Sequence, residues 1–414
     1  MEYGLIGGKL GHSFSKPIHE LVGGYDYQLV PLPTEDQARE FLEKREFRGI
    51  NVTIPYKKLV IPYCHWVAPQ AAAIGAVNCL VNREGKLYGY NTDYSGFCYL
   101  LDAHGIDLKD KVVLILGSGA THNTLTAVCK DRQAREILTA GRRGGEGILT
   151  YDQAAQRTDV QVILNASPAG MYPDNGSCLL DISRMEKLEG VADCVYNPFS
   201  TRLVLEAQKR GITAVGGFEM LVAQAVYAAQ LFMDKELDPD IIPRTVSRLR
   251  GELCNVSLVG MPSCGKSTIG HRLAKALGKT FVDLDDEIEK EAGKPIPEIF
   301  AQGGEEAFRA LETQVTARVT KGQNQVISTG GGIVTREENI PLLRQNGPVI
   351  WIRRPLDQLS VGGYRPLSKS PEVLAQMEQQ RTPLYRRAAD GILDNQGGLD
   401  QVLAQALELC RSLF

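Results

Sequence analysis

The chain has 414 residues, and at roughly 100–200 residues per domain this length predicts about two to four domains. Hydrophobic residues make up 43% of the chain and charged residues 23%, so the composition excludes a largely disordered protein. The 46 Lys and Arg residues are balanced by 49 Asp and Glu residues, and the net charge of −3 gives no indication of nucleic-acid binding.

The sequence shows no signal of export or membrane insertion. No apolar run approaches the roughly 18 residues of a membrane span, and residues 1–30 contain no basic segment followed by an apolar stretch. The nine Cys residues form no CxxC pair, which favours reduced thiols over a disulfide framework or a zinc site. We therefore expect a cytoplasmic protein whose partners are small molecules rather than nucleic acid or a membrane; no feature indicates an oligomeric state.

Short apolar strands alternate with helical stretches along the chain, a pattern typical of α/β folds with mostly parallel sheets. Glycine-rich turns between a strand and a helix occur at residues 117–121 and 260–267, which predicts two separate nucleotide-binding domains. Between them, prolines and aspartates interrupt residues 237–245, and the polar stretch 247–255 leads into a new strand. We therefore place the main domain boundary, a short linker, near residues 245–254.

Polar residues recur in short segments of the N-terminal part. Ser13 and Ser15 place two hydroxyl groups on one side of an extended or turning segment, and a strand end with proline precedes Lys57. Asn78 and Asp93 follow in similar polar segments. Taken singly, each has an ordinary structural interpretation: Asn78 as a turn residue, Asp93 as a helix N-cap and Lys57 as a surface charge.

The first glycine-rich turn follows the predicted buried strand 111–116 and precedes a predicted helix from about 121 to 131. Glycines in Gly117-Ser-Gly119 let the backbone approach a pyrophosphate at a helix N-terminus. The third glycine position of the GxGxxG fingerprint is His122, so this motif alone leaves an ordinary tight turn open. The next strand, 136–140, leads into Gly141-Arg142-Arg143, where two guanidinium groups suit a 2′-phosphate and favour NADP over NAD. The alternative is a solvated basic loop.

Together these segments resemble the shikimate dehydrogenase family over residues 1–240. The resemblance implies NADPH-dependent reduction of 3-dehydroshikimate to shikimate, by an α/β substrate-binding domain (1–97, completed by 217–245) and a Rossmann-like NADP domain (98–216). Quinate dehydrogenases share most of the blocks, so quinate stays open as the substrate. The blocks are Gly11-His-Ser-Phe-Ser-Lys-Pro-Ile-His19, Asn51-Val-Thr-Ile-Pro-Tyr-Lys57, Ile74-Gly-Ala-Val-Asn78, Asn91-Thr-Asp93, Asn165-Ala-Ser-Pro-Ala-Gly-Met171, Asp193-Cys-Val-Tyr-Asn-Pro198 and Gly217-Phe-Glu-Met-Leu-Val-Ala-Gln224.

By position, the resemblance implies that Lys57 and Asp93 form the catalytic pair. Reduction of a ketone needs a proton as the hydride arrives, and a lysine beside a carboxylate supplies a positioned donor. Gln224 lies in the apolar helix predicted at 219–233, where a buried amide needs a partner, so a ligand role fits. The residues implied to bind substrate are Ser13, Ser15, Thr53, Asn78, Tyr196 and Gln224; those implied to bind NADP(H) are Gly117, Ser118, Gly119, Ala120, Arg142, Arg143 and Gly217.

The second glycine-rich turn is a complete GxxxxGKS phosphate loop, Gly260-Met-Pro-Ser-Cys-Gly265-Lys266-Ser267, after the predicted strand 255–259. Backbone N–H groups would surround the phosphates, Lys266 would reach the β and γ oxygens, and Ser267 would ligate Mg²⁺. The strand predicted at 281–285 ends with two alternating carboxylates, Asp283 and Asp285, near this loop. The alternative is a polar strand end with a helix cap at Asp286.

Three further strands are predicted, at 325–329 before Gly330-Gly-Gly332, at 348–352 and at 391–394, which completes a parallel sheet of about five strands. Residues 255–414 resemble the shikimate kinase family, and we place this P-loop kinase domain at 252–414. The family transfers the γ-phosphoryl group of ATP to shikimate. The matching blocks are the phosphate loop, Asp283-Leu-Asp285, Gly304-Glu-Glu-Ala-Phe-Arg309, Gly330-Gly-Gly332, Arg365-Pro-Leu367 and Arg381-Thr-Pro-Leu-Tyr385.

The kinase resemblance implies a role for each matching residue. Asp285 would bind the shikimate hydroxyls and orient or deprotonate the nucleophile, and Asp283 would hold Mg²⁺ together with Ser267. Lys266 and Arg365 would stabilise charge on the transferring phosphoryl group. Arg309 and Arg381 would pair with the substrate carboxylate, with surface salt bridges as the alternative. Gly331 is also implied to contact substrate, and the nucleotide contacts are Gly260, Ser263, Cys264, Gly265, Lys266, Ser267 and Thr268.

The product of the first implied reaction is the substrate of the second. We therefore interpret the chain as a bifunctional shikimate-pathway enzyme that uses NADP(H) in one part and Mg²⁺ with ATP in the other. Two alternatives stay open. The front part could be an inactive or regulatory module, because its dinucleotide turn carries His122. The rear part could be a nucleotide-dependent switch, although a switch would not need Asp285, Arg309 and Arg381.

Overall fold

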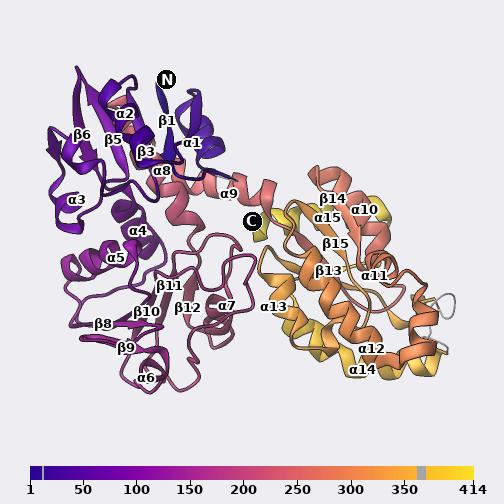
Figure 1. Cartoon of the computed structure of the whole chain (residues 1–414). Helices are drawn as coiled ribbons and strands as arrows, with labels where there is room; N and C mark the ends of the chain where they lie inside the picture. The colour runs from indigo at the N-terminus through magenta and orange to yellow at the C-terminus, as the bar shows by residue number, and fades with distance from the viewer. Residues whose placement is uncertain (12–13, 361–369) are drawn as a thin grey trace. The chain divides into compact units, whose positions relative to one another are not determined.

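The computed structural model describes residues 1–11, 14–360 and 370–414. The chain divides into two compact units, Met1–Val246 and Ser247–Phe414 (Figure 1). Within the described ranges, no helix combines the length and the apolar character that crossing a bilayer requires. The first unit consists of two lobes that each contain a six-stranded sheet, and the second unit contains one five-stranded sheet.

The N-terminal lobe is a mixed sheet in the order β2-β1-β3-β5-β6-β4. Strands β1, β2 and β3 are parallel, whereas β5 and β6 form an antiparallel hairpin beside β3. Leu80 and Leu87 of this hairpin are fully buried with Ile50 in the lobe's core. The elements are β1 (Tyr3–Gly7), α1 (Ser15–Gly23), β2 (Tyr27–Pro31), α2 (Glu35–Lys44), β3 (Gly49–Val52), β4 (Trp66–Val67), α3 (Pro69–Ile74), β5 (Cys79–Arg83) and β6 (Lys86–Tyr90).

The second lobe is a fully parallel sheet in the order β12-β11-β10-β7-β8-β9. Its first strand, β7, lies between β8 and β10, so the direction in which strands are added reverses beside β7; this is the doubly wound order of dinucleotide-binding folds. The elements are β7 (Val112–Leu116), α5 (Ala120–Asp131), β8 (Glu136–Gly141), β9 (Ile148–Thr150), α6 (Tyr151–Ala155), β10 (Val162–Asn165), β11 (Gly190–Asp193), α7 (Arg202–Lys209) and β12 (Thr213–Val215).

Helices cover both faces of this parallel sheet. Val113 and Ile115 of β7 share one core with α4 (Thr92–Ala103) and α5, while Leu114 packs on the other face with residues of α6 and α7. Successive strand residues point to opposite faces, which is why a strand buried on both sides is apolar throughout. Helix α4 also packs against α8 (Phe218–Met233), and a side chain at Gly96 would lie 2.8 Å from the Met220 carbonyl oxygen.

The region predicted as a polar linker, 245–254, is helical: α9 runs over Ile241–Leu253. The division between the two units, after Val246, falls inside this helix, so the segment joins the units as a helix and not as an irregular polar stretch. Its apolar residues have helical spacing. Ile242, Val246 and Leu249 lie three or four positions apart and are all buried. Pro243 is tolerated because it falls in the first turn, where a backbone N–H has no partner within the helix.

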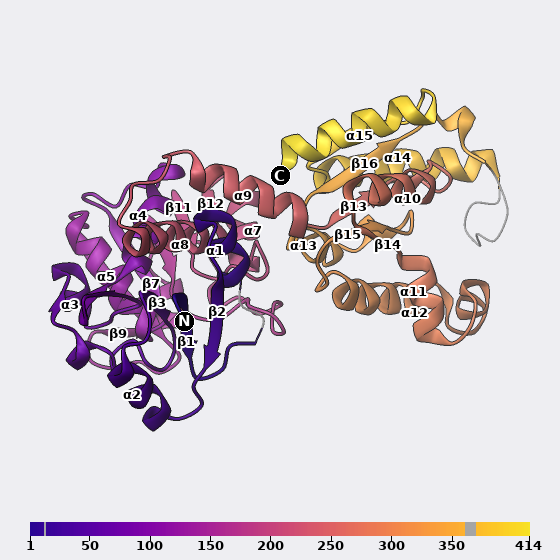
Figure 2. The same cartoon turned by 90° about the horizontal axis from the view of Figure 1, so that it is seen from above.

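The second unit is a parallel five-stranded sheet in the order β14-β15-β13-β16-β17, which confirms the predicted sheet. Its first strand, β13, again lies between two later strands, and α10 and α15 pack together beside the sheet (Figure 2). The elements are β13 (Val256–Val259), α10 (Lys266–Leu277), β14 (Thr280–Asp283), α11 (Leu284–Ala292), α12 (Ile296–Val319), β15 (Gln325–Ser328), α13 (Asn339–Arg344), β16 (Val349–Arg353), α14 (Pro371–Ala388), β17 (Gly391–Asp394) and α15 (Leu399–Leu413).

A fully buried carboxyl group, Asp193, lies at the end of β11 in the first unit. Its Oδ1 accepts hydrogen bonds from Asn165 Nδ2 and the Val195 N–H, both at 2.9 Å, and its Oδ2 accepts one from Thr201 Oγ1 at 2.6 Å. These three donors favour the charged form, but burial disfavours it more strongly and raises the pKa of Asp193 to about 7. Asp193 therefore joins the ends of β10 and β11 to the start of α7.

Asp193→Asn should flatten the pH dependence of the first unit's stability. Between pH 4 and 7 the native carboxyl holds a proton that the unfolded chain has released, since burial raises its pKa from 3.8 to about 7. The free energy of unfolding should therefore fall as pH rises through this range, by about 1.4 kcal/mol per pH unit for one proton. Asparagine cannot titrate, so the variant should lose this slope in denaturant unfolding measured from pH 4.5 to 8.

The exposed carboxyl Asp152, in the first turn of α6, provides the matched control. Asp152→Asn should keep the wild-type slope. Equal slopes in wild type and Asp193→Asn would contradict the assignment of a buried, protonated carboxyl.

Candidate active sites

In the first unit, Lys57 and Asp93 form an ion pair. Lys57 follows β3 in a turn, Asp93 lies in the first turn of α4, and Lys57 Nζ donates to Asp93 Oδ2 at 2.6 Å. The two side chains are 24% and 21% exposed, so water still reaches the pair. The N-cap of α4 is Asn91, whose side chain accepts from the Tyr94 N–H. The carboxylate of Asp93 is therefore not used as the helix cap, and Lys57 is not a solvated surface charge.

A cavity of about 330 Å³ surrounds this pair. It brings together residues from β3, α1, α4, α8 and the segment after β11, which lie far apart in the sequence. Ser13 lies outside the described residues. Of the other predicted substrate residues, the cavity is lined by Ser15, Thr53, Asn78, Tyr196 and Gln224; it also contains Lys9, Asn51, Cys194, Met220 and Leu221, which sequence reasoning did not single out.

The side chain of Asn78 forms hydrogen bonds with Thr92, so Asn78 is not simply a turn residue. Its Oδ1 accepts from the Thr92 N–H at 2.7 Å, and its Nδ2 donates to Thr92 Oγ1 at 3.2 Å. Asn51 Nδ2 donates to the Asn78 carbonyl oxygen at 3.3 Å, and Tyr27 OH donates to Asn51 Oδ1 at 2.7 Å. Because Thr92 precedes Asp93, this buried network fixes the position of the ion pair. The sequence signal for Asn51 was its place in the same polar block as Thr53.

Gln224 has partners inside the protein, so its amide is satisfied without a ligand, and its predicted role in substrate binding stays a prediction. Its Nε2 donates to the Leu221 carbonyl oxygen of the same helix at 2.9 Å, and its Oε1 accepts from Thr92 Oγ1 at 3.5 Å. The side chain still lines the cavity. A backbone carbonyl one turn away is a partner that the apolar pattern of the helix could not indicate.

The dinucleotide turn occupies the switch point of the parallel sheet. Gly117 has φ +97°, and a side chain there would come within 3.0 Å of Ser167, which follows β10. Gly119 is the N-cap residue of α5, so Ser118 and Ala120 flank the start of that helix. His122 Nε2 lies 2.9 Å from Thr139 Oγ1 of β8, so the residue at the third glycine position attaches α5 to the neighbouring strand. The turn is therefore held in one conformation by contacts with β8 and with the segment after β10, although its glycine motif is incomplete.

Arg142 and Arg143 follow β8, which runs parallel beside β7, so both arginines lie at the same edge of the sheet as the glycine turn. Both are exposed, and neither forms an ion pair within the described ranges. Two unpaired guanidinium groups here can bind an anion. Gly217 lies at the N-terminus of α8, where a side chain would be 2.4 Å from the Cys194 carbonyl oxygen.

In the second unit, the phosphate loop joins β13 to α10. Gly260 and Gly265 have φ of +148° and +101°, and Ser263 has φ +63°. Lys266 Nζ donates to the carbonyl oxygens of Gly260 at 3.0 Å and of Met261 at 2.9 Å, so the loop itself holds the lysine in this state. Cys264 is fully buried, and Thr268 lines the neighbouring cavity.

Ser267 and Asp283 form a direct contact. Ser267 Oγ donates to Asp283 Oδ2 at 2.8 Å, which places the hydroxyl and the carboxylate where one Mg²⁺ could contact both, directly or through water. The prediction that both carboxylates end a strand was wrong for Asp285. Strand β14 ends at Asp283, and Asp285 lies in the first turn of α11. Asp283, rather than Asp286, is the N-cap, since its Oδ1 accepts from the Asp285 N–H at 3.1 Å.

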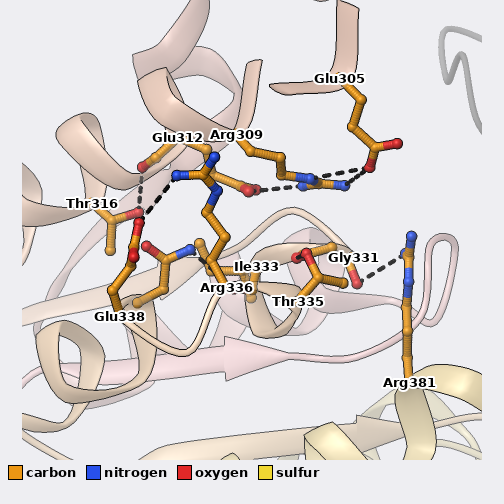
Figure 3. A network of polar contacts seen from close by, with 12 residues as sticks. Glu305, Arg309, Glu312, Thr316, Gly331, Ile333, Thr335, Arg336, Glu338 and Arg381 are labelled. Carbon is orange, nitrogen blue, oxygen red and sulfur yellow. Dashed lines mark hydrogen bonds and ion pairs between the residues drawn. The ribbon is translucent and has the colours of Figure 1, made fainter. Parts of the chain in front are cut away.

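Two buried arginines, Arg309 and Arg381, meet the triple-glycine segment (Figure 3). Arg381 Nη1 donates to the Gly331 carbonyl oxygen at 3.1 Å. A side chain at Gly332 would lie 2.0 Å from Arg309 Nη2, so only glycine lets this guanidinium approach the backbone. Both arginine side chains are buried against the segment, so neither is a surface charge. Arg309 nevertheless forms ion pairs with Glu312 and with the half-exposed Glu305, so the salt-bridge alternative holds in part for Arg309.

Sequence reasoning missed Glu312. It lies three residues after Arg309 on α12, it is fully buried, and its Oε2 accepts from Arg309 Nη1 at 2.7 Å. Burial raises the pKa of Glu312, and the charge of Arg309 opposes that shift. Within the described residues its Oε1 has no hydrogen-bond partner. The i, i+3 spacing from a predicted site arginine was the signal that could have identified it.

A cavity of about 390 Å³ unites the kinase-like residues. It is lined by the phosphate loop, both carboxylates of 283 and 285, the two buried arginines, Glu312 and Gly331. Arg365 lies outside the described residues. A separate cavity of about 490 Å³ in the first unit, between α3 and α8, contains none of the predicted site residues, although Asn91 and Thr92 form part of its wall.

Comparison with known proteins agrees with this division. The family model "Shikimate dehydrogenase substrate binding domain" matches residues 5–80, and the model "Shikimate kinase" matches residues 262–411. The chain is 32% identical over 253 residues to the shikimate dehydrogenase (NADP(+)) of Clostridium perfringens strain SM101, covering 57% of this chain and 93% of that protein. It is 35% identical over 260 residues to that of Halothermothrix orenii, covering 55% of this chain and 89% of that protein.

Solved structures show the same relationship. A chorismate mutase/shikimate 5-dehydrogenase fusion protein from Clostridium acetobutylicum is 33% identical with a TM-score of 0.57, covering 60% of this chain and 96% of that chain. The shikimate 5-dehydrogenase of Thermus thermophilus in complex with NADP(H) and shikimate is 26% identical with a TM-score of 0.53, covering 60% of this chain and 99% of that chain. The chain therefore belongs to the shikimate dehydrogenase family through its first unit and carries a shikimate kinase domain in its second.

Proposed function

We propose that this bifunctional shikimate-pathway enzyme catalyses two consecutive reactions. The first unit reduces 3-dehydroshikimate to shikimate with NADPH, and the second transfers the γ-phosphoryl group of ATP to shikimate. The observation that carries the proposal is the pairing, in one chain, of the Lys57–Asp93 contact at 2.6 Å with a phosphate loop whose cavity contains two buried arginines. We assign substrate binding to residues 1–97 with 217–245, NADP binding to 98–216 and the kinase to 252–414.

In the first reaction, Lys57 would donate the proton that the carbonyl oxygen needs as its carbon accepts a hydride. NADPH, when bound, supplies that hydride. Asp93 holds the Lys57 ammonium in place through their 2.6 Å contact. Ser15, Thr53, Asn78, Tyr196 and Gln224, with Ser13 beyond the described residues, would hold the substrate's hydroxyl and carboxylate groups. The exposed Arg142 and Arg143 would bind the 2′-phosphate of NADPH beside Gly117, Ser118, Gly119, Ala120 and Gly217.

In the second reaction, Lys266 would leave the carbonyl oxygens of its own loop and bind the phosphates of ATP. Ser267 and Asp283 would hold Mg²⁺, which usually reaches such sites with the phosphates. Asp285 would orient the attacking hydroxyl and accept its proton, while Arg309 and Arg381 hold the substrate carboxylate near Gly331. Arg365 would stabilise the transferring phosphoryl group. Gly260, Ser263, Cys264, Gly265 and Thr268 would complete the nucleotide contacts.

The direct test of both reactions is one incubation of the whole chain with 3-dehydroshikimate, NADPH and Mg-ATP, with products identified by mass spectrometry. We expect shikimate 3-phosphate. Asp93→Asn should lower the rate of 3-dehydroshikimate reduction by about 10²–10⁴, because the partner of the proton donor is lost. The kinase unit should still phosphorylate added shikimate at the wild-type rate. Asp285→Asn should instead cause shikimate to accumulate, with a similar loss in the second turnover.

Each outcome identifies the reaction that fails. Unreduced starting material from the wild-type chain would refute the dehydrogenase assignment and favour a regulatory front unit. Accumulated shikimate would refute the kinase assignment and favour a nucleotide switch. In the reverse direction, faster oxidation of quinate than of shikimate would identify the first unit as a quinate dehydrogenase.

Replacement of both dinucleotide-site arginines should change the preference between the two cofactors. Arg142→Ala combined with Arg143→Ala should raise KM for NADPH by about tenfold to hundredfold, because two charged hydrogen-bonding groups to a 2′-phosphate are lost. KM for NADH, which lacks that phosphate, should change much less. Arg135→Ala is the matched control, an exposed arginine at the opposite end of β8. Equal effects on NADPH and NADH would contradict the assignment.

A further inference from the structure

The guanidinium group of Arg309 is held between two glutamates of its own helix (Figure 3). Glu312 accepts one hydrogen bond, from Nη1 at 2.7 Å. Glu305 accepts two through one oxygen, from Nε at 3.3 Å and from Nη2 at 3.2 Å. Arg309 is itself 6% exposed, so these carboxylates account for most of its polar surroundings.

The donors that face Glu305 are those best suited to an incoming carboxylate. Nε and Nη2 lie along one edge of the planar guanidinium and can form two parallel hydrogen bonds to a single carboxylate. In this structure a carboxylate of the protein already occupies that edge. A substrate carboxylate that used the same edge would have to displace Glu305.

The two glutamates differ in how readily they can leave Arg309. The side chain of Glu312 is 0% exposed, and removal of a partner from a buried pair leaves an uncompensated charge. The side chain of Glu305 is 52% exposed, and ion pairs of that kind contribute little. Gly304, with φ +70° and ψ −173°, interrupts α12 directly before Glu305, so the helix is already broken at that point. Glu305 is therefore the carboxylate that can move into solvent at low cost.

We propose that Glu305 occupies the substrate-carboxylate edge of Arg309 when the kinase site is empty and is displaced by the carboxylate of the substrate. This inference rests on the proposed kinase function and extends it. It has two consequences. Glu305 keeps Arg309 paired between turnovers, and its competition for that edge weakens the binding of anionic substrates but not of uncharged analogues of the same shape.

The test is the KM for shikimate in the kinase reaction of the whole chain, measured as shikimate-dependent ADP release from Mg-ATP on wild type and Glu305→Gln. This readout reports the second unit alone, whereas the first unit would also bind shikimate. The amide keeps the size of the side chain and removes the competing charge. The KM for shikimate should be about two- to fivefold lower in the variant, as expected for the loss of competition from one exposed ion pair. The methyl ester of shikimate, which has no carboxylate, should have the same KM in wild type and variant.

Glu306→Gln is the matched control. Glu306 is the next residue on α12, its side chain is 86% exposed, and it pairs with Arg336 instead of Arg309. It lies beside Glu305 after the break in the helix, so a general effect of charge near that point would appear in both variants. Glu306→Gln should leave the KM for shikimate at its wild-type value.

Three results would overturn the proposal. An unchanged or higher KM for shikimate in Glu305→Gln would mean that the substrate uses another edge of Arg309 or needs Glu305 in place. An equal fall in KM for the methyl ester, or an equal fall in Glu306→Gln, would mean that the effect does not depend on the substrate carboxylate. A wild-type chain that releases no ADP in response to shikimate would refute the proposed kinase function together with this inference, whereas the first results refute the inference alone.

Discussion

Both nucleotide sites depend on one constraint, the meeting of parallel strand ends on either side of a central strand. Strand β7 lies between β8 and β10, and β13 lies between β15 and β16. In each sheet the connections on the two sides of the central strand run in opposite directions, which leaves a crevice beside the loop that follows this strand. Glycines with positive φ at Gly117 and Gly260 let the backbone turn there without a side chain. The helices that follow, α5 and α10, have no side-chain cap at their N-termini, so their first N–H groups point toward that crevice.

Buried polar networks carry the side chains of both sites on this framework. Asn51 and Asn78 position Thr92, which is adjacent to the acid of the Lys57–Asp93 pair. In the second unit, Glu312 holds one end of the Arg309 guanidinium, which lies close to the backbone of Gly332. Such groups are costly to bury unless they are hydrogen-bonded, and once bonded they hold one geometry. The chemistry of each site therefore depends on residues that do not themselves react.

Much of the fold could be predicted because its signals are local. Apolar runs of strand length, alternating with helices and glycine turns, identified two nucleotide-binding sheets and the five-stranded sheet of the kinase domain. The errors have physical reasons. The polar composition of residues 245–254 concealed the buried residues that have helical spacing in α9. Asp285 was placed on a strand because strand β14 passes directly into helix α11, and a boundary that sharp is not visible in the residue pattern.

The phosphate loop, the glycine turns and the types of residue available for each reaction could be predicted from the sequence, because they depend on neighbours along the chain. Which polar groups meet depends on the tertiary fold. Lys57 reaches Asp93 across the fold, Gln224 finds its partner in its own helix, and Glu305 and Glu312 share one guanidinium. Hydrogen bonds and ion pairs act over a few ångströms, and the folding of the sheets and helices sets which side chains come within that distance.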